Sequence, residues 1–131
     1  MEPVNTSPVI CPYITMQKIL SGKWTLLILC FLRQGALRFS ELLSFLPELN
    51  QASLTKHLRK LESDGIVKRT IYPQVPPKVE YELTETGKGL IPALDELAKF
   101  GMIYISEHVD EASENVCSSL GTKQCRCFGM N

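Results

Sequence analysis

Apolar residues in the first part of the chain recur at spacings of three and four, which is typical of helices. Pro12 suits the first position of a helix that runs to about Leu20, where a Ser-Gly pair stops it. A second helix is predicted from Trp24 to Leu32 and ends at Gly35. It is apolar nearly all round, so we expect it to be central, with Trp24 as a core anchor.

Two further helices, joined by residues 47–49, predict a helix-turn-helix. Ser40 is expected to cap the first of them, which runs from Glu41 to about Leu46. Asn50 is expected to cap the second, which closes at Gly65. The buried face of this second helix is predicted to consist of Gln51, Leu54, Leu58 and Leu61.

The period of the pattern then changes to two, which predicts two strands, Val67 to Tyr72 and Val79 to Leu83. Their connection, residues 73–78, holds three prolines and therefore predicts a stiff, projecting loop. Residues 37–39 are too short for more than a scrap of strand. The hairpin follows the helix-turn-helix directly and is expected to form its wing.

A final long helix is expected with Thr84 as its cap, and Gly87, Gly89 and Pro92 predict a late start or a kink. Its apolar stripe is expected to pack partly on its own domain and partly on a second copy. The stripe consists of Leu90, Leu94, Leu97, Gly101 and Ile105.

The 131 residues suffice for about one domain. We expect residues 1–10 to be a flexible arm, residues 11–109 the domain and residues 110–131 a tail without fixed structure. The longest apolar run covers seven residues, far fewer than the roughly 20 of a membrane span. Without a visible secretory signal, the cytoplasm is the expected location.

The net charge is zero but unevenly distributed. Residues 50–79 carry six basic and two acidic side chains, a net +4, whereas residues 84–114 carry two basic and seven acidic ones, a net −5. Such an asymmetry favours one surface that faces a polyanion. Ordinary solvated charge is the alternative interpretation.

The outward face of the fourth helix combines small side chains with cations, a combination suited to base edges and phosphates of DNA. The wing is expected to reach the minor groove or its phosphates. A hydroxyl and a cation at the start of the third helix favour a further phosphate contact. The expected DNA-contacting residues are Arg38, Ser40, Gln51, Ala52, Ser53, Thr55, Lys56, Arg59, Lys60, Gln74 and Lys78. His57 is expected to be a packing or phosphate-contacting residue.

Several motifs in register resemble the HxlR-type family of bacterial winged helix-turn-helix regulators: Cys11-Pro12, residues 22–29, 38–42, 54–69 and 72–87. The resemblance implies an α+β, mostly helical fold with a two-stranded wing. It also implies a homodimer on an inverted-repeat operator, joined through the first and last helices, with Ile14 and the apolar stripe at the interface. An enzyme is not expected, because no phosphate loop, metal spacing or acid pair is present.

Five cysteines are expected to be free thiols in a reducing compartment. Cys11 lies at a helix N-terminus, which favours a reactive thiolate. Family members that respond to quinones, hypochlorite or aldehydes use a cysteine at the matching position, so the resemblance implies sensing of an oxidant or electrophile. Cys30 is expected to be inert. The tail cysteines are Cys117, Cys125 and Cys127, and their spacing does not match a zinc site.

Two alternatives to a DNA-binding sensor that uses Cys11 stay open at this level. In the first, the signal is a small molecule in the dimer cleft, and Cys11 is only a cap residue. The module could also dock a protein without reading DNA. No cofactor is expected, and the sequence does not give the operator, the target genes or the sign of regulation.

Overall fold

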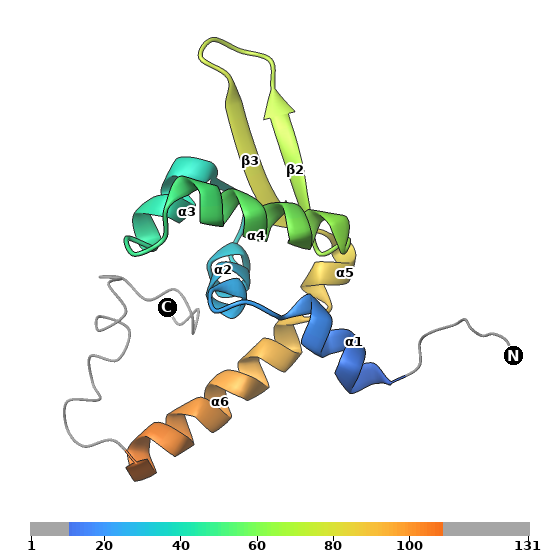
Figure 1. The fold of residues 1–131 in the computed structure, drawn as a ribbon, viewed down its shortest axis with the longest axis vertical. Coiled ribbons are helices and arrows are strands. Elements are labelled where there is room, and N and C mark those ends of the chain that lie inside the picture. The colour runs from blue at the N-terminus through green and yellow to red at the C-terminus, as the bar shows by residue number, and fades with distance from the viewer. Residues whose placement is uncertain (1–10, 109–131) are drawn as a thin grey trace, which may run out of the picture.

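The computed structural model describes residues 11–108, and Figure 1 shows their arrangement. The expected α+β, mostly helical winged helix-turn-helix is confirmed. Two helices and a two-residue strand precede the helix-turn-helix, and a hairpin and two helices follow it. The elements are α1 (Pro12–Ile19), α2 (Thr25–Leu32), β1 (Leu37–Arg38), α3 (Phe39–Phe45), α4 (Gln51–Ser63), β2 (Val67–Tyr72), β3 (Lys78–Leu83), α5 (Glu85–Lys88) and α6 (Ile91–His108).

The central helix α2 supplies the middle of the core, as its pattern predicted. Ile28 and Leu29 have no exposed surface, and Trp24, the residue before α2, is buried as expected. The ring of Phe31 packs on that of Phe45 from α3, with the centroids 5.2 Å apart. Leu26 is the exception, with 42% of its surface exposed.

The two helices of the helix-turn-helix begin differently. Asn50 caps α4 as predicted, because its Oδ1 accepts a hydrogen bond of 2.8 Å from the backbone N–H of Ser53. The prediction that Ser40 caps α3 is wrong: Arg38 is the capping position, and its N–H donates to Oε1 of Glu41 at 2.8 Å. The carboxylate can reach back over the first turn, whereas Ser40 already lies within that turn.

The buried face of α4 consists of three leucines rather than four residues. Leu54, Leu58 and Leu61 are almost fully buried, as predicted. Gln51 is exposed, so its assignment to the buried face is wrong. As the first residue of α4 it lies at the end of the leucine row, where its amide can stay in water instead of losing its hydrogen bonds in the core.

The wing belongs to a sheet of three antiparallel strands in the order β1-β3-β2. β2 and β3 pair from Val67 with Leu83 to Tyr72 with Lys78. The wing is two-stranded as predicted, and the scrap of strand expected at residues 37–39 is β1. Its pairing with the free edge of β3, through Leu37 and Tyr81, was not predicted because two residues are too few to show a period. The loop projects as predicted.

The expected late start of the last helix is confirmed as a break into α5 and α6. The side-chain oxygen of Thr84 caps α5, because it accepts a 3.0 Å hydrogen bond from the backbone N–H of Gly87. α6 then starts at Ile91 and extends away from the body of the molecule (Figure 1). Within residues 11–108, no helix has both the length and the apolar composition needed to cross a membrane.

Candidate nucleic-acid interface

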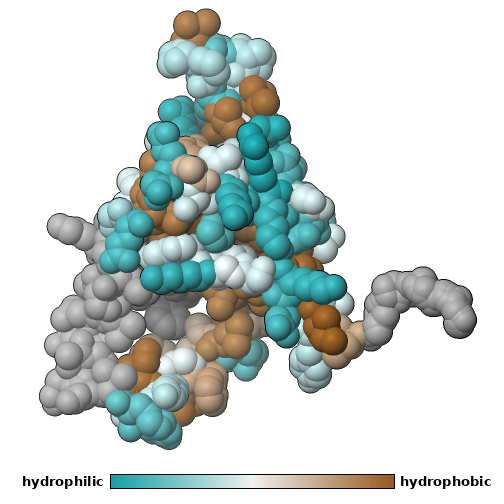
Figure 2. Space-filling view, viewed as in Figure 1, coloured by the Kyte–Doolittle hydropathy of each residue, from teal (hydrophilic) through white to brown (hydrophobic). Residues whose placement is uncertain are grey.

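The outward face of α4 carries cations that the rest of the fold leaves available. Ala52, Lys56 and Arg59 are exposed on the side opposite the buried leucines. Among residues 11–108, neither Lys56 nor Arg59 takes part in a salt bridge. Figure 2 shows that hydrophilic residues cover α4 and the lower part of the hairpin. Ser53 and Thr55 are half-buried at the edges of this face.

Lys60 is the cation of α4 that the fold uses internally. Its Nζ donates to the backbone oxygen of Lys18 at 2.5 Å and lies 2.9 Å from Oδ2 of Asp64. A third contact of 3.5 Å joins it to the backbone oxygen of Ile19. Lys60 therefore faces the end of α1, and its predicted DNA contact competes with these interactions.

His57 lies one turn before Lys60 on the same side of α4. Its Nδ1 is 2.8 Å from the backbone oxygen of Ser53. Its Nε2 would lie 3.0 Å from a Cβ atom added to Gly22, in the turn between α1 and α2. This half-buried position at the edge of the leucine row agrees with the packing interpretation.

The start of α3 brings Arg38 and Ser40 together on the surface. Arg38 precedes the helix and Ser40 lies in its first turn, and both are exposed. Their proximity follows from adjacency in the sequence. Their predicted contact with the DNA backbone stays a prediction.

The wing presents few available charges. Lys78 pairs with Glu80 at 3.3 Å and lies over the ring of Tyr72, with Nζ 4.9 Å from the centroid. The Tyr72 hydroxyl donates to Oε1 of Glu80 at 3.2 Å, and this hydrogen bond raises the pKa of Tyr72. Gln74 is exposed at the tip beside Val75, whose surface is 98% exposed. The tip can therefore contact a groove mainly through apolar and amide groups.

The apolar stripe of α6 divides between the core and the surface. Leu94 is buried in the core, Leu90, Gly101 and Ile105 are half-buried, and Leu97 is 52% exposed. A wider set of exposed apolar side chains on α6 was not predicted from the stripe: Phe100, Met102, Ile103 and Tyr104. The sequence could have indicated these residues, because apolar residues occupy more than one side of α6. Figure 2 shows the brown surface along this helix.

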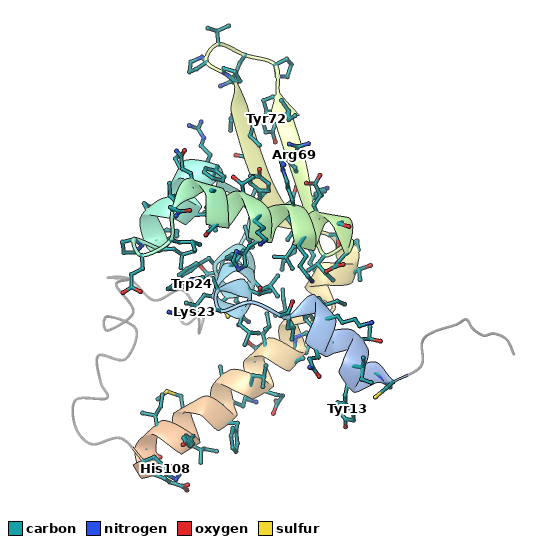
Figure 3. All side chains as sticks on the ribbon, viewed as in Figure 1. Tyr13, Lys23, Trp24, Arg69, Tyr72 and His108 are labelled. Atoms are coloured by element: carbon teal, nitrogen blue, oxygen red, sulfur yellow. The ribbon has the colours of Figure 1, made fainter. Side chains whose placement is uncertain are left out.

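The helix α1 adds to the exposed apolar surface. Tyr13 is 85% exposed and Ile14 is 55% exposed. Tyr13 points away from the body of the molecule in Figure 3. Side chains of this size are rarely left in contact with water over a whole helix face, which indicates an interaction surface.

Cys11 occupies the capping position of α1, as predicted, and its thiol is free and half-buried. Its backbone oxygen accepts hydrogen bonds from the N–H and the hydroxyl of Thr15, at 3.0 and 3.1 Å. Cys30 is also half-buried, on α2. The arm and the tail, with the three remaining cysteines, lie outside the described residues. Within residues 11–108, no three His, Cys, Asp or Glu side chains group in a way that could hold a metal ion.

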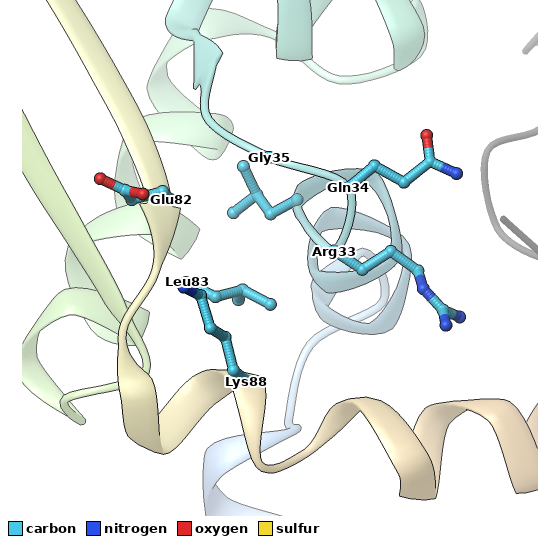
Figure 4. A pocket seen from close by; sticks show the side chains of 7 residues that line it. Arg33, Gln34, Gly35, Glu82, Leu83 and Lys88 are labelled. Carbon is cyan, nitrogen blue, oxygen red and sulfur yellow. The ribbon is translucent and has the colours of Figure 1, made fainter.

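A small pocket lies between the end of α2, β3 and α5 (Figure 4). Its volume is about 240 Å³, and its walls include the polar side chains of Arg33, Gln34, Glu82 and Lys88. Arg33 forms a salt bridge of 2.5 Å with Asp95, and its hydrogen bond lowers the pKa of that carboxyl group. Small-molecule sites are mostly apolar and roughly 300–1,000 Å³ in volume, so this pocket does not qualify as an effector site.

Comparisons with known proteins agree with this geometry. A family model described as HxlR-like helix-turn-helix matches residues 19–109. An uncharacterised helix-turn-helix-type transcriptional regulator of Methanothermobacter thermautotrophicus is 50% identical over 95 residues, which cover 72% of each chain. The family and these relatives are transcriptional regulators and not enzymes, as the sequence predicted.

Three solved structures of two transcriptional regulators are also similar to this chain. The redox regulator HypR in its reduced form is 38% identical, with a TM-score of 0.71, over 73% of this chain and 95% of that one. HypR has also been solved in an oxidised form, with 41% identity and a TM-score of 0.67, over 70% of this chain and 95% of that one. The reduced form of the transcriptional regulator YodB from Bacillus subtilis is 30% identical, with a TM-score of 0.63, over 78% of this chain and 97% of that one.

Proposed function

Because the chain belongs to the HxlR-like helix-turn-helix family of transcriptional regulators, we propose that it acts as a homodimer on an inverted-repeat operator. In this proposal, α4 enters the major groove and Ala52, Ser53, Thr55 and Gln51 approach base edges. Lys56 and Arg59 contact phosphates. The observation that carries the proposal is the exposed cationic face of α4, backed by three buried leucines.

The second copy accounts for the apolar surface of α6 and α1. Phe100, Leu97 and Ile103 expose half or more of their surface on one helix. Within residues 11–108, no atom beyond the neighbouring backbone of α6 itself lies within 4 Å of a Cβ atom added to Gly101, so a partner helix can approach closely at this position. A two-fold axis beside α6 would bring the same apolar patch of both copies together and remove it from water.

Selection of bound fragments from random duplexes tests the proposal. We expect the retained fragments to share an inverted repeat whose half-sites are spaced by about one helical turn, roughly 10 base pairs, or a multiple of it. The affinity should fall steeply with salt, with a slope of about −0.9 for each phosphate contacted. Sedimentation should give a dimer. A monomer with no sequence preference and a flat salt dependence would instead favour a protein-docking module.

We propose further that Cys11 senses an oxidant or an electrophile. The support is its free thiol at the start of α1 and the likeness to HypR and YodB. Modification of the thiol would add bulk or charge at the capping position, next to the exposed apolar side chains of α1. That change would alter how the two copies pack and so shift the spacing of the recognition helices.

The variant Cys11→Ser is expected to bind the selected duplex as the wild type does, because serine also suits a helix cap. Treatment with diamide should change the duplex affinity of the wild type but leave that of the variant unaltered. Cys30→Ser is the matched control and should respond like the wild type. An unchanged diamide response in Cys11→Ser would remove Cys11 from the mechanism. A response that vanishes only when residues 110–131 are deleted would assign it to the tail.

A further inference from the structure

The end of α1 is fastened to the flank of α4 by one side chain. The backbone oxygens of Lys18 and Ile19 belong to the last turn of α1, where carbonyl groups lack partners within the helix. The ammonium group of Lys60, 42 residues further along the chain, donates to the Lys18 oxygen at 2.5 Å and reaches the Ile19 oxygen at 3.5 Å. A cation at this end of a helix also interacts favourably with its dipole.

The ammonium has three protein acceptors within 3.5 Å in this position. Its third donor is directed at Asp64, whose Oδ2 lies 2.9 Å away. Lys60 therefore has three acceptors for three N–H groups. Lys56, one turn earlier, has an exposed side chain and no salt bridge among residues 11–108. The two lysines of α4 thus have different environments, although both were predicted from the sequence to contact DNA.

A close approach of the two segments lies one turn earlier on the same flank of α4. Gly22 follows α1 and has a φ of +106°, a conformation that favours glycine. A Cβ atom there would lie 3.0 Å from Nε2 of His57. His57 thus lies close to the turn after α1, beside the Lys60 contacts with the last carbonyl groups of that helix. We call these Lys60 contacts and the neighbouring approach of His57 to Gly22 the joint between the two helices.

The rest of α1 is weakly packed, and its apolar attachment lies at the same end of the helix. None of its eight residues is buried and only Met16 and Ile19 are half-buried, while Ile19 and the next residue, Leu20, pack against the core. α1 is about 12 Å long, with Cys11 at one end and the Lys60 contact at the other. The joint is therefore the polar route by which a displacement of this weakly packed helix can reach α4.

We propose that Lys60 couples α1 to the recognition helix rather than contacting a phosphate. Its ammonium holds the last carbonyl groups of α1, so that the position of α1 and the position of α4 are energetically linked. The inference rests on the proposed DNA-binding function, since it assigns duplex binding to α4. The coupling does not depend on whether Cys11 is the sensor. Because linkage between two sites is reciprocal, duplex binding at α4 must also stabilise α1, and this effect can be measured without an oxidant.

Hydrogen exchange in the full chain tests the coupling. In the wild type, the selected duplex is expected to slow exchange of the amides of residues 15–21 by roughly fivefold or more, which corresponds to the lower end of common coupling strengths. In Lys60→Met, which keeps the apolar stem and loses the ammonium, the duplex should leave this exchange within about twofold of the free protein. Lys60→Arg retains a cation with several donors and should restore the protection.

The salt dependence of duplex affinity separates coupling from a phosphate contact. Lys56→Met, the matched control on the same helix, should reduce the slope by about 0.9 for each protomer. Lys60→Met should leave the slope at the wild-type value. Asp64→Asn gives a second measure that keeps the lysine and should weaken the duplex-dependent protection of α1.

The outcomes separate the two proposals. Failure of the wild type to bind any duplex would overturn the proposed function and the coupling with it. Duplex binding without protection of residues 15–21 would overturn the coupling alone. So would protection that persists in Lys60→Met, or a salt slope that Lys60→Met reduces as much as Lys56→Met does.

Discussion

Duplex affinity is expected to fall by roughly 100-fold or more when Lys56→Glu and Arg59→Glu are combined, at salt concentrations between about 50 and 200 mM. Both side chains lie on the exposed face of α4, and neither has a salt-bridge partner among residues 11–108. Each replacement removes an attraction to phosphate and adds a repulsion. A dimer carries the change twice. Fluorescence anisotropy on the selected duplex measures the loss.

The control places the same charge change outside the proposed DNA interface. Lys88→Glu combined with Lys99→Glu alters lysines of α5 and α6 that pair with acids of their own helices, at 3.5 and 3.0 Å. Long-range electrostatics should weaken binding by only a few-fold, because charges farther apart than about 10 Å are largely screened. Equal losses in the two double variants would mean that α4 is not the DNA-facing helix. Circular dichroism should show that both variants are folded.

Gly87→Ala is expected to reduce the free energy of unfolding by about 3 kcal/mol, the upper part of the usual cost of overpacking. A Cβ atom on Gly87 would lie 2.2 Å from the backbone oxygen of Ile66. That oxygen cannot move away easily, because it accepts hydrogen bonds from the N–H and the hydroxyl of Thr84, at 2.9 and 3.2 Å. The melting temperature should fall by roughly 10 °C.

Thr86→Ala is the matched control, since it introduces alanine at the neighbouring, exposed position of α5. Its free energy of unfolding should stay within about 0.5 kcal/mol of the wild type. The comparison is made by thermal unfolding at equal protein concentrations. A Gly87→Ala protein that melts with the wild type would contradict the close packing of α5 on Ile66.

The Lys56/Arg59 double variant and Gly87→Ala differ in how far the sequence alone could predict their effects. The leucine row of α4 predicted which side of the helix is buried, and the opposite side then followed from helical geometry. Lys56 and Arg59 could therefore be placed on the outward face without a structure. Gly87 was recognised only as a residue that weakens a helix, because its contact with Ile66 joins two elements that are distant in the chain.

The same distinction explains the corrections. Several neighbouring side chains can cap a helix, so the sequence narrows the capping residue to a few candidates. Asn50 and Thr84 were predicted correctly, but Ser40 was predicted where the Glu41 carboxylate caps the turn. β1 was missed as a sheet member because two residues carry no period. Its pairing depends on the free edge of β3, a partner more than 40 residues away.

The order of the elements, the central position of α2, the family and the cationic side of α4 could all be predicted from the sequence, because periodicity and local motifs report interactions within a few residues. The contacts between distant elements could not: Lys60 turns toward α1, Lys78 is neutralised by Glu80, and α6 leaves Phe100 uncovered. These outcomes depend on which surfaces meet after folding. A charge or an apolar side chain has the same identity in the sequence whether or not a partner from another element reaches it.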